Sequence, residues 1–140
     1  MNILVINGPN MNLLGRREPA LYGTQSYEAL CGCIRAYCAE RGVNVAFFQS
    51  NHEGAIIDAV QSAIGHADGI VINPAAYTHT SIAIADALRA AAVPAVEVHL
   101  TDISAREDYR RISYTREVCI AAISGKGFEG YLEAIDLLIK

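Results

Sequence analysis

Apolar positions along the chain fall into two alternating patterns. The first is a short, nearly continuous apolar run, which is typical of a strand buried on both faces of a parallel sheet. Five segments have this pattern: residues 2–7, 43–49, 69–73, 95–100 and 118–124. In the second pattern, apolar side chains recur three and four positions apart, as on one face of an amphipathic helix. Four segments have it, over roughly residues 27–41, 51–64, 81–92 and 128–139.

The ends of the predicted helices have sequence signals of their own. Gly42 is expected to end the first helix, because glycine readily adopts the left-handed conformation that follows a helix. Ser50 and Glu53 have the spacing of a capping box and are expected to begin the second helix. Either Thr80 or Ser81 is expected to cap the third helix.

Strands and helices that alternate in this way predict an α/β fold with three layers, in which a five-stranded parallel sheet lies between two layers of helices. The simplest strand order is 2-1-3-4-5, the flavodoxin-like arrangement. We expect residues 1–140 to form a single domain of this kind, since 140 residues suit one hydrophobic core. The polar stretch 101–117 is expected to contain one helical turn near residues 106–110.

Polar side chains end all five predicted strands. In an open parallel sheet, ligands bind beyond the carboxyl ends of the strands, near the point where the strand order reverses. Capping and turn formation are the ordinary roles for each of these residues taken singly. Their convergence on one edge nevertheless predicts a site there. The residues are Asn7, Ser50 and Asn51, Asn73, His99 and Ser124.

Composition narrows the possible functions. The net charge is −4, with 11 Lys and Arg against 15 Asp and Glu, which gives no long-range attraction for nucleic acid or an anionic membrane. The first apolar run is too short for a signal peptide, and no stretch approaches the ~20 apolar residues that span a bilayer. The cysteines lack zinc-site spacing. Cys31 and Cys38 share one helix face, so we expect buried thiols in a reducing cytoplasm.

Two ligand classes common on such folds do not fit the residues that follow the strands. Gly8 and Gly15 form neither a GxGxxG dinucleotide motif nor a phosphate-binding P-loop. A phospho-receiver domain would need acidic residues after the first and third strands. This chain has Asn7 and Asn73 at those places, so neither nucleotide binding nor phosphotransfer signalling is indicated.

Candidate anion-binding and acid–base groups follow the third and fourth strands. His79 lies just before a helix start, which suits an anion, although ordinary capping with a surface histidine is the alternative. Glu97 and His99 lie on one face of a strand, so the carboxylate would fix the imidazole for general acid–base catalysis. A structural ion pair is the alternative. Arg106 and Arg110 have i, i+4 spacing and would reach the same edge, unless they form a solvated basic surface.

Residues 8–26 form a connection that is long for a compact domain. The connection contains Asn12, Arg16, Arg17 and Tyr22. A free phenol has a pKa of about 10, and neighbouring guanidinium groups would lower it. A phenolate at Tyr22 would be able to remove a proton next to a carbonyl, while Asn12 holds a water or an oxyanion. The alternative is that Tyr22 packs down as an anchor of the loop.

Segments over nearly the whole chain resemble the type II 3-dehydroquinate dehydratases, also called type II dehydroquinases. They are LVINGPNMNLLGRREPALYG, QSNHEGAIIDAV, INPAAYTHTSIAIADAL, VEVHL and SGKGFEGY, in that order. The resemblance implies a flavodoxin-like fold and loss of water from 3-dehydroquinate to give 3-dehydroshikimate, in the shikimate pathway of aromatic amino acid biosynthesis or in the quinate pathway. It further implies an anti elimination through an enolate, without a Schiff base, a metal or an organic cofactor.

The resemblance assigns catalytic roles by motif. Tyr22 would remove the proton next to the ketone, and Arg17 would depress the pKa of Tyr22 and stabilise the transition state. Asn12 would position a water that supports the enolate. His99, held by Glu97, would protonate the departing hydroxyl group.

Substrate contacts follow from the same resemblance. The backbone N–H groups of Leu100 and Thr101 would take the substrate carboxylate, and Arg106 would close over the site. The ring hydroxyl groups would be bound by Asn73, His79 and Arg110.

An assembly is also implied by the resemblance. Members of the family form dodecamers of four trimers, in which an Asp at the position of Asp86 reaches a neighbour's active site. The helix that contains Asp86 is apolar on several sides, which an interface would explain. A local ion pair between Asp86 and Arg89 is the alternative.

The match to the family is imperfect in the stretch HLTDISARED. The family usually has Asn at the position of Asp102 and His at that of Ser104, and often has Ser and Phe at those of Thr101 and Tyr109. Thr101 keeps a hydroxyl group, so carboxylate binding should survive. Asp102 adds negative charge near a site for an anionic substrate, so an effect on affinity or on subunit contacts is expected.

Two other functions remain open from the sequence alone. A non-catalytic binding module, such as a sensor of small anions, would bind the ligand without turnover and would not need the set Tyr22, Arg17 and His99. A different lyase that acts on a related cyclic hydroxy-ketone is the nearest enzymatic alternative.

Overall fold

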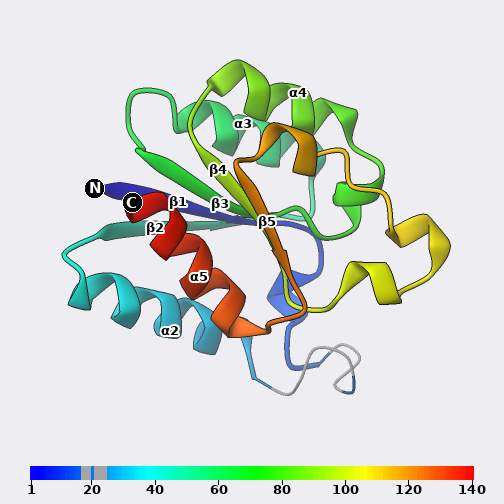
Figure 1. The fold of residues 1–140 in the computed structure, drawn as a ribbon, viewed down its shortest axis with the longest axis horizontal. Coiled ribbons are helices and arrows are strands. Elements are labelled where there is room, and N and C mark those ends of the chain that lie inside the picture. Colours follow the sequence, from blue (N-terminus) through cyan, green and yellow to red (C-terminus); the bar gives the residue numbers. More distant parts are fainter. Residues whose placement is uncertain (17–19, 21–24) are drawn as a thin grey trace.

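The computed structural model describes residues 1–16, 20 and 25–140. Across these residues, five parallel strands form one sheet in the order β2-β1-β3-β4-β5, with helices on both faces (Figure 1). The predicted α/β class and flavodoxin-like strand order are therefore confirmed. The strands are β1 (Asn2–Asn7), β2 (Asn44–Gln49), β3 (Gly69–Asn73), β4 (Ala95–His99) and β5 (Ala121–Ser124).

Within the described residues, two helices cover each face of the sheet. Figure 1 shows α2 and α5 on one side and α3 and α4 on the other. In β3, Val71 packs with the α2–α5 layer while Ile70 and Ile72 pack with the α3–α4 layer, since successive side chains of a strand point to opposite faces. The helices are α2 (Tyr27–Glu40), α3 (Glu53–Ser62), α4 (Ile82–Ala91) and α5 (Phe128–Ile139).

The helix starts agree only in part with the sequence signals. Ser81 caps α4, because its Oγ accepts a hydrogen bond from the N–H of Ile84 at 2.9 Å. The capping box predicted for α3 is wrong: Ser50 Oγ instead accepts from the N–H of His52, and His52 is the N-cap. The carboxylate of Glu53 accepts from the Ser81 hydroxyl at 2.5 Å, so a tertiary contact between α3 and α4 replaces the local one.

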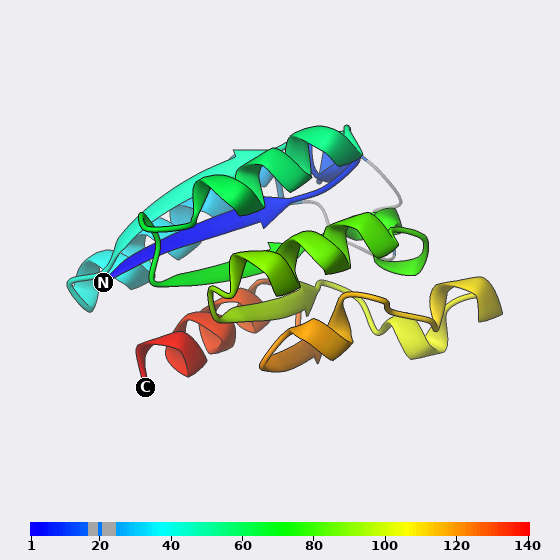
Figure 2. The ribbon, with the colours of Figure 1, turned by 90° about the horizontal axis from the view of Figure 1, so that it is seen from above.

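The polar stretch 101–117 is more turned than expected. It contains the short 3-10 helices η3 (Ile103–Ala105) and η4 (Asp108–Arg110), and a third, η5 (Arg116–Val118), ends it. The fifth strand therefore begins at Ala121 rather than at residue 118. Figure 2 shows this stretch, coloured yellow to orange, lying largely beyond the carboxyl ends of the strands, where it can close over that edge of the sheet.

A close backbone contact joins the loops that leave β1 and β3, at the point where the strand order reverses. The N–H of Gly8 donates to the carbonyl of Asn73 at 2.8 Å. A Cβ atom on Gly8 would lie 2.4 Å from the carbonyl oxygen of Pro74, so only glycine fits there. The two loops thus begin from a fixed common position.

Two expectations drawn from composition can be compared with the structure. Cys31 and Cys38 are buried in α2 and have free thiols, as predicted. Among the described residues, no helix is long and apolar enough to cross a membrane.

Candidate active site

A cleft opens at the carboxyl edge of the sheet, between the loops that follow β1, β3 and β4. Seven of the expected site residues line it, together with Met11, Ala75 and Ile103. The seven are Asn73, His79, His99, Leu100, Thr101, Arg106 and Arg110. Residues far apart in the sequence thus meet around one small space.

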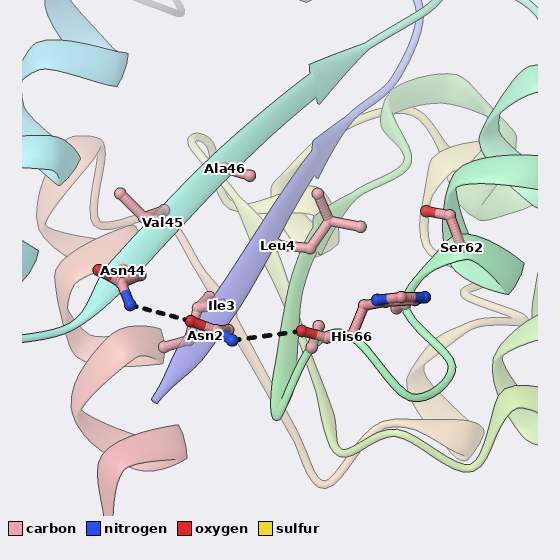
Figure 3. Close-up of a pocket in the computed structure, with 10 residues that line it drawn as sticks. Asn2, Ile3, Leu4, Asn44, Val45, Ala46, Ser62 and His66 are labelled. Carbon is pink, nitrogen blue, oxygen red and sulfur yellow. Dashed lines mark hydrogen bonds between the residues drawn. The ribbon is translucent and has the colours of Figure 1, made fainter.

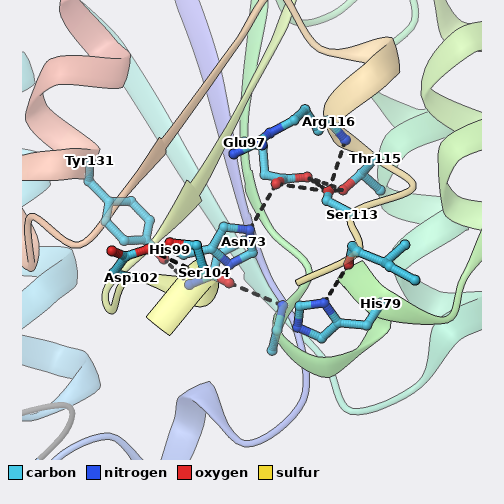
Figure 4. A network of polar contacts seen from close by, with 12 residues as sticks. Asn73, His79, Glu97, His99, Asp102, Ser104, Ser113, Thr115, Arg116 and Tyr131 are labelled. Atoms are coloured by element: carbon cyan, nitrogen blue, oxygen red, sulfur yellow. Dashed lines mark hydrogen bonds and ion pairs between the residues drawn. The ribbon is translucent and has the colours of Figure 1, made fainter. Parts of the chain in front are cut away.

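The centre of the cleft wall is a buried carboxylate–imidazole pair at the end of β4. Glu97 Oε2 lies 2.9 Å from His99 Nε2, and both side chains are almost fully buried. Two hydroxyl groups from the stretch after η4 also donate to Glu97. Ser113 Oγ lies 2.9 Å from Oε1 and 3.0 Å from Oε2, and Thr115 Oγ1 donates to Oε1 (Figure 4).

The contacts of Glu97 determine its charge. Burial alone would raise the pKa of this carboxyl group, but the bonds from His99, Thr115 and Ser113 outweigh burial and lower the pKa below its ordinary value. Glu97 is therefore an anion at neutral pH. Because it holds Nε2 of His99, the ring nitrogen Nδ1 is left for a ligand in the cleft. The pair fixes an imidazole that can give or take one proton there.

His79 enters the cleft in a different state. Its Nδ1 lies 2.6 Å from the carbonyl oxygen of Ile112, so Nδ1 is the protonated nitrogen. Burial lowers the pKa of His79, and the nearby His99 and Arg110 lower it further, against the bond to Ile112. A neutral His79 leaves Nε2 as an acceptor. An acceptor at this position suits a ligand hydroxyl group, whereas the sequence suggested an anion there.

Two arginines bring positive charge to the cleft. Arg110 Nε lies 2.9 Å from Glu107 Oε2, and Arg106 Nε lies 3.8 Å from the same oxygen. Arg106 also donates from Nη1 to Thr101 Oγ1 at 3.4 Å. Glu107 thus holds both guanidinium groups from the exposed side while both line the cleft, so they form part of the site rather than a solvated surface.

The Asn73 carboxamide lies in the cleft wall at the end of β3 and is held from behind. Its Oδ1 accepts from the N–H of Ala75 at 3.0 Å, and its Nδ2 donates to the hydroxyl of Tyr131 at 3.0 Å. The Tyr131 hydroxyl donates in turn to Asn7 Oδ1 at 2.5 Å. One hydroxyl group on α5 therefore donates at the end of β1 and accepts at the end of β3.

Three supporting residues were not expected from the sequence. Tyr131 lies in the predicted helix over residues 128–139 and ends the segment SGKGFEGY, and its hydroxyl group on an otherwise apolar helix face is the only signal for a polar role. Ser113 and Thr115 lie 16 and 18 residues after Glu97 in an irregular stretch, and no periodicity links them to it.

The other expected site residues lie elsewhere. Asn12, in η1 (Met11–Leu13), is exposed and lines a neighbouring hollow, with its Oδ1 3.4 Å from Gln49 Nε2. Asp86 is exposed on α4 and pairs with Arg89 at 3.2 Å, which is the local ion pair left open by the sequence. Tyr22 and Arg17 lie outside the described residues.

The two clearest departures from the family pattern contact each other. Asp102 Oδ1 accepts from the N–H of Ser104 at 3.0 Å and from its hydroxyl at 2.6 Å, and so caps η3. These bonds lower the pKa of Asp102. The added negative charge stays beside Thr101, a residue of the cleft wall, but its carboxylate is bound to η3.

A wider hollow at the opposite, amino edge of the sheet has a different character. It measures about 300 Å³ and is lined by residues of β1, β2 and the end of α3, including Asn2, Asn44 and His66 (Figure 3). The Asn2 side chain bonds to Asn44 and to the carbonyl of His66. The hollow has no carboxylate and no paired acid and base in its lining. It is wider than the cleft, but the carboxylate–imidazole pair lies at the carboxyl edge.

The fold and the carboxyl-edge cleft together define an α/β enzyme whose cleft is built for acid–base chemistry. The family described as "Dehydroquinase class II" matches residues 1–139. The chain therefore belongs to the class II dehydroquinase family, and with it to the 3-dehydroquinate dehydratases, which are hydro-lyases.

Individual relatives agree with this family over nearly their full lengths. Catabolic 3-dehydroquinase 2 of Neosartorya fischeri is 49% identical over 139 residues, which are 99% of this chain and 93% of that protein. The 3-dehydroquinate dehydratase of Clostridium acetobutylicum is 52% identical over 138 residues, 99% of this chain and 96% of that protein. The crystal structure of type II dehydroquinase from Butyrivibrio crossotus superimposes with a TM-score of 0.98 at 51% identity, covering 100% of this chain and 98% of that one.

Proposed function

We propose that the protein removes water from 3-dehydroquinate to give 3-dehydroshikimate by an anti elimination through an enolate. The observation that carries this proposal is the buried Glu97–His99 pair, which opens on a cleft lined by Arg106 and Arg110. A dehydration needs a base for the proton next to the ketone and an acid for the departing hydroxyl group. The cleft supplies the acid, and two arginines suit a substrate with a carboxylate.

His99 is the proposed acid. Its imidazole would pass a proton from Nδ1 to the leaving hydroxyl group, while the ionised Glu97 stabilises the imidazolium form before the transfer. The low pKa of Glu97 supports this role, since a neutral carboxyl group would give no such stabilisation. Burial of the pair excludes water and strengthens the interaction between the two groups.

Tyr22 is the proposed base, with Arg17 lowering its pKa and stabilising the transition state. Both residues lie outside the described part of the chain, and their support is the family motif in which they stand. Asn12, exposed in η1 beside the cleft, would hold the water that stabilises the enolate oxygen. A hydrogen bond to developing negative charge is the usual way to lower such a barrier.

The remaining cleft residues would bind the substrate. The carboxylate would accept from the backbone N–H groups of Leu100 and Thr101, with Arg106 closing over it. The ring hydroxyl groups would meet Asn73, His79 and Arg110, the other polar residues of the cleft wall. The neutral His79 accepts a hydrogen bond, and the Asn73 amide donates one. Together they suit hydroxyl groups, which both donate and accept hydrogen bonds.

We further propose the assembly and setting implied by the family. Residues 1–140 would act as one catalytic domain in a dodecamer of four trimers, with Asp86 reaching a neighbour's site. Large apolar side chains lie exposed near the cleft, at Ile82, Ile112 and Tyr114, and an interface would cover them. The enzyme would work in the cytoplasm, in the shikimate or quinate pathway, without metal or organic cofactor.

One assay tests the reaction. The purified protein and 3-dehydroquinate alone should give the ultraviolet absorbance of a conjugated enone, and Tyr22→Phe should abolish it while the circular dichroism spectrum stays unchanged. Binding without any turnover would favour the small-anion sensor instead. Turnover only with another cyclic hydroxy-ketone would favour a different lyase.

A further inference from the structure

Tyr131 is a fully buried tyrosine in the first turn of α5, and its hydroxyl group lies at the carboxyl ends of β1 and β3. It donates to Asn7 Oδ1 at 2.5 Å and accepts from Asn73 Nδ2 at 3.0 Å. Burial raises the pKa of Tyr131, so the phenol keeps its proton. In Figure 4 its ring points from α5 toward the residues of the cleft wall.

The directions of these hydrogen bonds are determined. Asn7 Nδ2 donates to the hydroxyl of Tyr27 at 3.3 Å, which leaves Asn7 Oδ1 as the acceptor for Tyr131. Because the single proton of Tyr131 goes to Asn7, its oxygen must accept the bond from Asn73. A buried hydroxyl with both bonds satisfied has one favourable orientation.

The Asn73 carboxamide is oriented by this network. The N–H of Ala75 occupies Oδ1, and the Tyr131 oxygen occupies one of the two hydrogens of Nδ2. A flipped amide would place Nδ2 against the N–H of Ala75 and Oδ1 against the lone pairs of Tyr131. Both contacts would then be lost inside the protein, where an unsatisfied polar group is costly.

The second hydrogen of Asn73 Nδ2 has only a weak acceptor. Its partner is Met11 Sδ at 3.7 Å, and thioether sulfur accepts hydrogen bonds poorly. Met11 and Asn73 both line the cleft. An oxygen of a ligand in the cleft would therefore be a better partner for this hydrogen than the sulfur.

We infer that Tyr131 is a positioning residue: it holds the Asn73 carboxamide so that one N–H faces the cleft and donates to a ring hydroxyl group of the substrate. This inference rests on the proposed function. Tyr131 itself does not line the cleft and acts through Asn73. Its contribution is therefore to substrate binding, whereas the proton transfers belong to other residues.

The test is a double-mutant cycle in the enone assay. Tyr131→Phe removes one hydroxyl group and should raise KM about fivefold to tenfold, as expected for one hydrogen bond, with kcat within about threefold. In the Asn73→Ala background the same change should leave KM within about twofold, because the amide that it orients is absent. A purely structural role would instead give the same loss of thermal stability and the same KM change in both backgrounds, which would overturn the inference.

A matched control is available on α2. The hydroxyl of Tyr37 donates to Asp136 at 2.7 Å, outside the cleft lining, so Tyr37→Phe should leave KM unchanged. An equal KM increase in Tyr37→Phe would contradict the inference. Absence of turnover in the wild-type protein would instead overturn the proposed function, so the two failures are distinguishable.

A measurement on the wild-type chain covers the case in which Tyr131→Phe does not fold. With asparagine labelled with ¹⁵N, the side-chain amide signals of Asn73 are assigned by their absence in Asn73→Ala. Addition of 3-dehydroshikimate should shift the resonance of the amide hydrogen that faces Met11. The resonance of the other amide hydrogen, which is bonded to Tyr131, should stay unchanged. If neither hydrogen shifts at saturating product, the inference is wrong.

Discussion

The hydroxyl of Ser113 donates to both carboxylate oxygens of Glu97, at 2.9 Å and 3.0 Å, while the ring of His99 holds one of them. A single serine from an irregular stretch thus helps to keep a buried carboxylate ionised and aligned. The general acid proposed at His99 therefore depends on a residue that lies outside the motif VEVHL.

Ser113→Ala should lower kcat about threefold to tenfold, because Glu97 loses a donor that fixes its orientation toward His99. The free energy of unfolding should fall by about 1–3 kcal/mol, since a buried acceptor loses a partner. Enone formation and urea unfolding at neutral pH measure the two effects. Ser62→Ala, in α3, is the control, because Ser62 Oγ donates only to its own helix, at Ala59 O.

The pH dependence of Ser113→Ala follows from the same bonds. The pKa of Glu97 is below its ordinary value of 4.5, so its contribution to stability is present above that pH and is lost as the pH falls through the lowered value. With fewer donors the pKa of Glu97 rises toward 4.5, so the loss of stability on acidification should be smaller in Ser113→Ala and should be complete at a higher pH than in the wild type. Superimposable acid-unfolding curves would contradict this account.

His79, like Glu97, should make the folded protein less stable as the pH falls. Its pKa is lowered from 6.5, so as the pH falls below 6.5 the unfolded chain binds a proton more readily than the folded one, and stability declines. His79→Gln should remove this part of the decline. Urea unfolding of both proteins above and below pH 6.5 measures it, with the exposed His52→Gln as the control. A decline of the same size in His79→Gln would rule out His79 as its source.

Asp102→Asn tests the departure from the family pattern beside the cleft. The amide oxygen can still accept from Ser104, so the cap of η3 should survive while one negative charge is removed. KM for an anionic substrate should fall by up to about threefold at low salt, and the difference should vanish near about 0.5 M salt, because exposed charges are screened. A KM difference that persists at high salt would indicate a change of geometry instead.

Asp86→Ala and Arg89→Ala separate a local ion pair from a role in a neighbour's site. Both changes break the 3.2 Å pair on α4, and an exposed pair of this kind contributes little to stability, so unfolding should change by under about 1 kcal/mol in each. If Asp86 reaches another subunit, only Asp86→Ala should reduce kcat/KM, by about tenfold. Equal activities of the two variants would assign Asp86 to the local pair alone.

Local features of the chain were predictable because they depend on neighbours in the sequence. Glu97 and His99 share a strand face by the two-residue period, and that contact is present at 2.9 Å. The alternation of apolar runs with segments of helical period was enough to predict the strand order, because crossover connections allow few strand orders in a parallel sheet. Ser81 as a helix cap is likewise a local choice.

Predictions failed where a distant partner competed with a local one. Glu53 bonds to Ser81 of the next helix instead of closing a capping box with Ser50. The fifth strand begins late because η5 holds residues 116–118 in a turn. Thr115, which begins η5, donates to Glu97 of β4, so in both cases a contact between segments that are distant in the sequence is involved.

The fold, the family and most of the polar residues around the cleft could be inferred from the sequence, because strand periodicity and motif spacing are properties of short segments. The side chains that support these polar residues became known from the three-dimensional packing. Ser113 and Thr115 reach Glu97, and Tyr131 reaches Asn73 across 58 residues, through packing of layers that no local period encodes. Hydrogen-bond partners in a core are selected by proximity in space, and that proximity exists only once the layers have assembled.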